Sequence, residues 1–217
     1  MKLLYLKKWL FPGIIMCICC VCPVNSRGDD DELFIKIWDG IQDTQLNYHS
    51  ASGKIVETRT SKLLQKPLQF SGKFYVMNPD KFCMEYLNPA ALKIIYNAGT
   101  VTIIFQREEP VTEVFDVAKN VARTKSYFSE KNSYKKLLKD FNVTAKEAAS
   151  WFEIKMVSEK ERFKNRINYV IIRLDKKTYL PQRLEIDGTN GINSVFEIEV
   201  VDINGKIDNS VFEYKQN

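Results

Sequence analysis

The sequence has few of the side chains on which most enzymes depend. His49 is its single histidine, so a histidine-based triad would rest on one residue in a polar stretch, where a surface or turn position is the ordinary one. There is no glycine-rich phosphate loop, no dinucleotide fingerprint and no cysteine–histidine cluster at metal-ligand spacing. Carboxylates that could pair fall in polar loops or strand ends, at Glu108–Glu109, Glu159, Glu161, Asp202 and Asp208. We therefore predict that the protein is not an enzyme and has no cofactor or metal.

Cysteine is also scarce outside the N-terminus. Four of the five cysteines lie between residues 17 and 22, and Cys83 is the only one beyond them. An intramolecular disulfide in the remainder of the chain is therefore excluded, and stability must come from packing. Because Cys83 alternates with Phe82 and Met84, we expect its side chain to point away from the face that those two share. It is then a sheltered thiol with no base beside it, not a nucleophile.

The pattern of the N-terminal residues indicates the cellular compartment of the protein. Lys2, Lys7 and Lys8 precede an apolar run, Trp9 to Cys22, which is shorter than the ~20 residues that span a membrane. Small residues before Arg27 suit cleavage, so residues 1–26 are predicted to be a secretory signal peptide that delivers the chain to the periplasm. Residues 27–217 would then form one domain. An alternative is a lipid anchor on one of the four N-terminal cysteines, although none follows a small residue.

The charge of the exported chain is nearly balanced. Removal of the three signal lysines would leave 29 basic residues against 27 acidic ones. A balance of this kind gives no electrostatic reason to expect nucleic acid or a strongly anionic partner.

The most informative segment alternates between large apolar and polar side chains. Phe70, Gly72 and Phe74 lie on one face of a period-2 pattern, and a second run with Phe82, Met84 and Tyr86 follows. The two Asn-Pro steps, at residues 78–79 and 88–89, each end a strand, since proline removes a backbone donor. Residues 97–100, with glycine available for a positive φ, predict a hairpin loop. This combination of alternating strands, proline breaks and a hairpin loop indicates an antiparallel sheet.

Other segments complete a mainly β (α+β) pattern. Leu33, Phe34, Ile37, Trp38 and Ile41 recur at helical spacing and predict an amphipathic helix over residues 30–43. Ser52–Gly53 is expected to form a turn between two strands. The period changes between residues 110 and 141, which predicts two short helices broken near residues 131–133. Further strands are expected at residues 151–157, 167–175, 181–187, 194–203 and 211–214, with a hairpin loop at 188–191.

The order of these patterns resembles the LolA family of periplasmic outer-membrane lipoprotein carriers. The likeness lies in the F-x-G-x-F strand of Phe70 to Phe74 with the two proline-bounded steps that follow, in the segment from Leu174 to Ile186, and in the ending Ile203 to Asp208 with Val211–Phe212. It covers residues 32–214. The resemblance implies an unclosed, strongly curved antiparallel β-barrel with a helical lid and an N-terminal helix over an apolar cavity.

On this resemblance, large apolar side chains would line the cavity and bind lipid. The alternative for each is an ordinary core position. The expected lipid-binding residues are Phe70, Phe74, Val76, Phe82, Met84, Tyr86, Ile94, Ile103, Phe105, Phe152, Ile154, Met156, Val170, Ile172, Leu174, Phe196 and Ile198. The expected lid and latch residues are Asn78, Val117, Val121, Phe128, Leu137 and Leu138, within a segment from Val114 to Phe141 that would open. Asn78 stands where carriers of this family have a latching arginine, and it lacks the charge and the forked donors of arginine.

These features predict a carrier that binds the acyl chains of lipoproteins, or another lipid, and moves them from the inner to the outer membrane. Its expected partners are acylated lipoproteins or other lipids, an inner-membrane donor transporter and an outer-membrane acceptor, with no nucleic acid, and the chain is expected to be a monomer. Two alternatives remain open. One is a membrane-anchored acceptor that resembles LolB, and the other is a lipid-sensing regulatory module that resembles RseB.

Overall fold

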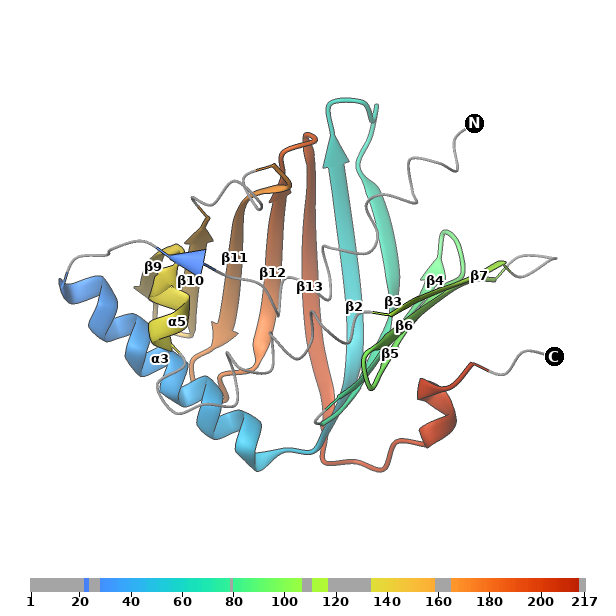
Figure 1. Cartoon of the computed structure of the whole chain (residues 1–217), viewed down its shortest axis with the longest axis horizontal. Coiled ribbons are helices and arrows are strands. Elements are labelled where there is room, and N and C mark those ends of the chain that lie inside the picture. Colours follow the sequence, from blue (N-terminus) through green and yellow to red (C-terminus); the bar gives the residue numbers. More distant parts are fainter. Residues whose placement is uncertain are drawn as a thin grey trace.

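A computed structural model describes residues 22–23, 28–78, 80–106, 111–116, 134–158 and 165–214. Eleven antiparallel strands form one sheet in the order β7-β6-β5-β4-β3-β2-β13-β12-β11-β10-β9 (Figure 1). The strands are β2 Ser50–Ser61, β3 Leu68–Met77, β4 Lys81–Asn88, β5 Leu92–Asn97, β6 Thr100–Phe105, β7 Val111–Asp116, β9 Asn142–Glu147, β10 Trp151–Val157, β11 Ile167–Asp175, β12 Pro181–Gly188 and β13 Ile192–Ile203. Because β7 and β9 lie at opposite ends of this order, the sheet is unclosed, as predicted.

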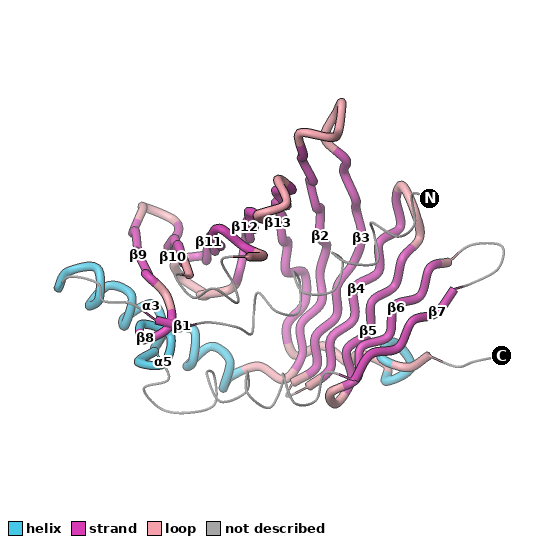
Figure 2. The backbone as a smooth tube through the Cα atoms, turned by 45° about the horizontal axis from the view of Figure 1, so that its top comes forward, coloured by secondary structure: helices cyan, strands magenta, loops and turns pink. Residues whose placement is uncertain are grey.

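One long helix and several short elements accompany the sheet. The helix α3, Gly28–Asn47, is the predicted amphipathic helix with slightly wider bounds. It contacts β9, and the short helix α5, Tyr134–Leu138, lies beside the two-stranded pair of β1, Cys22–Pro23, with β8, Lys139–Asp140. Figure 2 places these elements together at the β9 end of the sheet, away from β7. The mainly β class with an N-terminal helix is therefore confirmed.

The period-2 alternation divides the strand side chains between two faces. We call the face that packs on α3 and α5 the helix face, and the opposite one the outer face. Phe34, Ile37 and Trp38 of α3 are buried in the same apolar cluster as the alternate residues of the strands. The outer face carries a smaller cluster of Cys83, Ile95, Ile104 and Phe212. Cys83 thus points away from Phe82 and Met84, as the alternation predicts.

The turn predicted at Ser52–Gly53 is wrong. Both residues lie inside β2, which runs unbroken for 12 residues. A Cβ atom on Gly53 would lie 2.0 Å from the carbonyl oxygen of Glu199 on β13 and 2.7 Å from the Phe74 ring on β3. Glycine at this position therefore allows the neighbouring strands to approach closely. Besides forming turns, glycine commonly has this role within strands.

The strand predicted at residues 211–214 is also wrong. Asn209–Phe212 forms the 3₁₀ helix η1, whose N-cap is Asp208. The Asp208 carboxylate accepts a hydrogen bond of 2.8 Å from the Ser210 amide, so the short polar side chain satisfies a donor that a strand would have used in a ladder. Phe212 then turns onto the outer face.

The helices predicted between residues 110 and 141 need a partial correction. Val111–Asp116 is not helical but forms the edge strand β7, paired with β6. The second helix exists over Tyr134–Leu138 only, because the chain continues as β8 and β9. Residues 117–133, with the expected lid residues Val117, Val121 and Phe128, lie outside the described part of the structure.

The remaining strands follow the sequence closely. Trp151–Val157 and Ile167–Asp175 have the predicted bounds. The hairpin between β5 and β6 has Ala98 at φ 45° and Gly99 at φ 95°, the two positive values that a tight two-residue loop requires.

Candidate functional site

The structure brings every expected lipid-binding residue into one cluster on the helix face. Eleven of them are buried, namely Phe74, Met84, Tyr86, Ile94, Ile103, Phe152, Ile154, Met156, Val170, Leu174 and Phe196. The other six are half-buried and pack against them, namely Phe70, Val76, Phe82, Phe105, Ile172 and Ile198. Burial of this kind agrees with a core, while the half-buried residues leave apolar surface on which a ligand could pack. Their role in binding lipid remains a prediction.

A buried carboxylate lies within this apolar face, and the sequence analysis did not predict it. The side chain of Glu57 on β2 is only 1% exposed. One carboxylate oxygen accepts hydrogen bonds from Nε and Nη2 of Arg59, at 2.9 and 2.6 Å, and the other accepts the Tyr86 hydroxyl at 2.5 Å. The Arg59 guanidinium also lies 4.9 Å from the centre of the Phe70 ring. Burial, reinforced by the carboxylate of Glu57, raises the pKa of Tyr86 above its usual value, so the hydroxyl stays a donor.

The period-2 pattern contained a signal for this group. Glu57 is two residues from Ile55, which belongs to the helix-face cluster, and two residues from Arg59. Alternation therefore places the carboxylate and the guanidinium on the apolar face, and a buried charge calls for a partner.

The expected latch residue, Asn78, forms hydrogen bonds to the segment that joins α3 to β2. The side-chain amide of Asn78 donates to the carbonyl of Tyr48 at 2.8 Å, and its backbone amide donates to the carbonyl of His49 at 2.8 Å. Asn78 thus fixes the link between α3 and β2. Of the expected lid residues, Leu137 is buried and Leu138 half-buried in the helix-face cluster.

A groove of about 550 Å³ runs along α3. Gly40 of α3 lies so near the Tyr179 ring that a Cβ atom there would be 2.2 Å from it. Four of the seven lining residues are charged, which suits acyl chains less well than the helix-face cluster does. The lining residues are Glu32, Ile35, Lys36, Asp39, Gly40, Asp43 and Tyr179.

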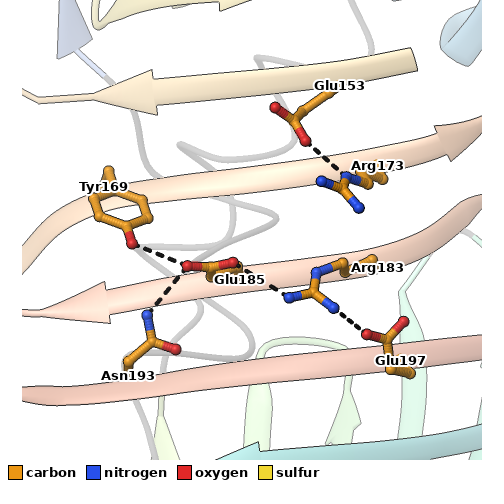
Figure 3. Close-up of polar contacts among 7 residues, drawn as sticks. All are labelled: Glu153, Tyr169, Arg173, Arg183, Glu185, Asn193 and Glu197. Carbon is orange, nitrogen blue, oxygen red and sulfur yellow. Dashed lines mark hydrogen bonds and ion pairs between the residues drawn. The ribbon is translucent and has the colours of Figure 1, made fainter. Parts of the chain in front are cut away.

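The outer face of β10 to β13 carries paired charges (Figure 3). Arg173 donates to Glu153 at 2.7 Å, and Arg183 bridges Glu185 and Glu197. Tyr169 donates to Glu185 at 2.9 Å, and burial together with this hydrogen bond raises the pKa of Tyr169 to about 12. Opposite charges on neighbouring strands stabilise the sheet. This part of the outer face is therefore polar and internally satisfied.

Neither His49 nor Cys83 has the surroundings of a catalytic group. His49 is exposed. Burial raises the pKa of Cys83 to about 12, and the nearby Lys93 offsets this only in part. In the part of the chain that the structure describes, no group of three or more His, Cys, Asp or Glu side chains could hold a metal ion.

The Cys83 thiol should be unreactive in the folded protein. With a pKa of about 12, roughly one thiol in ten thousand is ionised at pH 8, and only the thiolate attacks a disulfide reagent. A disulfide reagent should therefore count equal numbers of thiols in native wild type and in native Cys83→Ser, and one more in wild type after unfolding in urea. A thiol lost from the native count on Cys83→Ser substitution would contradict this burial.

An unclosed antiparallel sheet with one apolar face against helices defines the fold class, and the comparisons assign the family. The family model described as "Outer membrane lipoprotein carrier protein LolA" matches residues 47–215. The chain belongs to the LolA family, a family of lipoprotein carriers. No curated protein matches the chain.

Several solved structures of low identity are similar to the chain, and one of them has a TM-score above 0.5. An uncharacterized conserved protein from Thermus thermophilus has a TM-score of 0.54 at 8% identity, with 85% of this chain and 95% of that chain covered. A LolA superfamily protein from Nitrosomonas europaea has a TM-score of 0.40 at 7% identity, with 83% and 97% covered. A chain of the Pseudomonas aeruginosa MucA/MucB complex has a TM-score of 0.48 at 8% identity, with 83% and 61% covered. Among the described residues, no helix is long and apolar enough to cross a membrane.

Proposed function

We propose that the protein is a periplasmic carrier that binds the acyl chains of lipoproteins, or of another lipid, on its helix face and moves them from the inner to the outer membrane. The observation that carries the proposal is the continuous apolar cluster on that face, which reaches from Phe105 on β6 to Met156 on β10. Membership of the LolA family supports it. The N-terminal signal pattern supports export to the periplasm.

The energetics of acyl chains explain why a carrier needs such a face. Each methylene group taken out of water contributes about 0.8 kcal/mol, so a lipid with long chains does not leave a bilayer unaided. An apolar surface of comparable extent offsets this cost during transfer. Half-buried aromatic side chains such as Phe70, Phe82 and Phe105 provide area that can pack on chains without fixed geometry.

The proposal is tested by lipid binding to wild type and to Phe82→Glu. An environment-sensitive lipophilic probe should gain fluorescence with the wild-type protein and be displaced by long-chain lipids. Phe82 is half-buried on the helix face, so a carboxylate there would be desolvated by a bound acyl chain. We expect Phe82→Glu to weaken binding by roughly tenfold or more while far-ultraviolet circular dichroism remains unchanged.

Val114→Glu provides the matched control. Val114 is 62% exposed on β7 and pairs with Thr102, which is itself opposite Ile95 of the outer-face cluster. The same carboxylate on this face should leave probe binding as in wild type. A wild-type protein that gives no fluorescence gain, or a folded Phe82→Glu variant that binds as wild type does, would overturn the proposal for this face.

A further inference from the structure

The buried group of Glu57, Arg59 and Tyr86 offers hydrogen-bond donors in the middle of an apolar face. A guanidinium has five N–H groups, and Arg59 uses its Nε and one of its Nη2 hydrogens on Glu57. The described residues provide Arg59 with no second hydrogen-bond acceptor. The carboxylate of Glu57 already accepts three hydrogen bonds, two from Arg59 and one from Tyr86, so the group has more spare donors than spare acceptors.

The group lies where the helix face passes from buried to exposed. Along β3, the residues on this face change from Phe74, 7% exposed, to half-buried Phe70 and then to Leu68, 41% exposed. Phe70 is paired with Glu57 and Leu68 with Arg59. The Arg59 side chain itself is 20% exposed. An acyl chain packed against the buried end of the face would therefore have its polar end near Arg59 and its headgroup beyond Leu68.

The charges of Glu57 and Arg59 determine which polar group of a bound lipid could lie beside them. One guanidinium and one carboxylate cancel, so the remaining N–H groups donate without a net positive charge. A neutral carbonyl oxygen can accept such a bond with no further charge brought out of water. A free carboxylate or a phosphate would leave a net negative charge beside the buried Glu57, which is costly.

We propose that Arg59, held by Glu57 and Tyr86, binds the ester or amide carbonyl that links an acyl chain to its headgroup, and so selects esterified or amidated chains over free fatty acids. This rests on the proposed function, because it assigns the polar end of a ligand whose chains lie on the helix face. Glu57 and Tyr86 are positioning residues, since they fix the orientation of the guanidinium.

The test compares ligands that differ in one group. A long-chain methyl ester, the ether of equal length and the free fatty acid at pH 8 are titrated against the lipophilic probe bound to the full exported protein. The ether keeps the apolar contacts and lacks the carbonyl. We expect the ester to bind about tenfold more tightly than the ether, the effect of one hydrogen bond from a charged donor, and the free acid to bind more weakly than the ester.

Variants then test whether Glu57, Arg59 and Tyr86 cause the preference for the ester over the ether. The triple variant Glu57→Leu/Arg59→Met/Tyr86→Phe removes the donors and leaves no partner unpaired, so the ratio of ester to ether affinity should fall to about one. Arg183→Met makes the same arginine change on the outer face, where Arg183 contacts Glu185 and Glu197, and should keep the preference. If the triple variant does not fold, Arg59→Lys removes the forked donors and keeps the charge, and the preference should fall.

The outcomes are distinguishable from those of the proposed function. If wild type binds neither ester nor ether, the carrier proposal fails and this one fails with it. If wild type binds both equally well, the helix face binds chains but Arg59 does not bind the carbonyl. A preference for the ester that survives in the folded triple variant would likewise overturn the inference.

Discussion

Glu57→Leu is expected to lower the free energy of unfolding by about 3 kcal/mol, the lower end of the range for breaking a buried charged pair. The substitution removes the acceptor for both Arg59 and the Tyr86 hydroxyl, and Tyr86 is buried at 1% exposure. The expected loss is at the lower end because the Arg59 side chain still reaches solvent. Thermal unfolding should show a midpoint roughly 6–12 °C lower, since 1 kcal/mol corresponds to about 2–4 °C in a domain of this size.

Two controls test whether the loss of stability comes from leaving Arg59 and Tyr86 without an acceptor or from replacing a glutamate as such. Glu199→Leu makes the same change at a solvent-exposed ion pair, in which Glu199 lies 3.1 Å from Lys54, and should cost under about 1 kcal/mol. Adding Arg59→Met and Tyr86→Phe to Glu57→Leu should restore most of the stability, because replacing all partners by apolar groups of similar shape is nearly neutral. A Glu57→Leu variant as stable as Glu199→Leu would mean that the carboxylate is not buried among its partners.

Sequence patterns predicted the bounds of several strands but not the contacts of the polar group, for a physical reason. The bounds of Trp151–Val157 follow from alternation within one strand, which is a local property. The contact between Glu57 and Tyr86 joins β2 to β4, two strands away and 29 residues along the chain. Alternation places Glu57 on the apolar face, but only the register of three strands brings the Tyr86 hydroxyl to its carboxylate. Side-chain pairing across a sheet therefore required the structure.

Two of the wrong element assignments arise from residues with more than one structural use. Gly53 follows a serine, a pairing typical of turns, yet it lies where Glu199 and the Phe74 ring approach the backbone. Val211–Phe212 is a short apolar pair that fits a strand, while the Asp208 side chain shortly before it favours a helical turn. In both cases the deciding contact is made by a residue distant in sequence or by a capping side chain.

Phe212→Ala is expected to lower the free energy of unfolding by about 3–5 kcal/mol, the usual loss for truncating a buried phenylalanine. Phe212 is 1% exposed although it stands near the end of the chain, and it packs on Cys83, Ile95 and Ile104 of the outer face. The η1 turn is also held by the Asn97 side-chain amide, which donates to the Phe212 carbonyl at 3.3 Å. Urea unfolding should show a lower midpoint with an unchanged slope.

Tyr214→Ala is the matched control, because Tyr214 is an exposed aromatic residue two positions further along the same tail, and its loss should cost under about 0.5 kcal/mol. Two further measurements locate the damage in Phe212→Ala. The Cys83 thiol, which Phe212 covers, should react with a disulfide reagent in the native variant, while the lipophilic probe should bind as in wild type because the helix face is untouched. Equal stability of the two variants would mean that η1 does not pack on the sheet. A variant that kept its stability and lost probe binding would instead place part of the ligand site on the outer face, contrary to the proposal that ligands bind on the helix face.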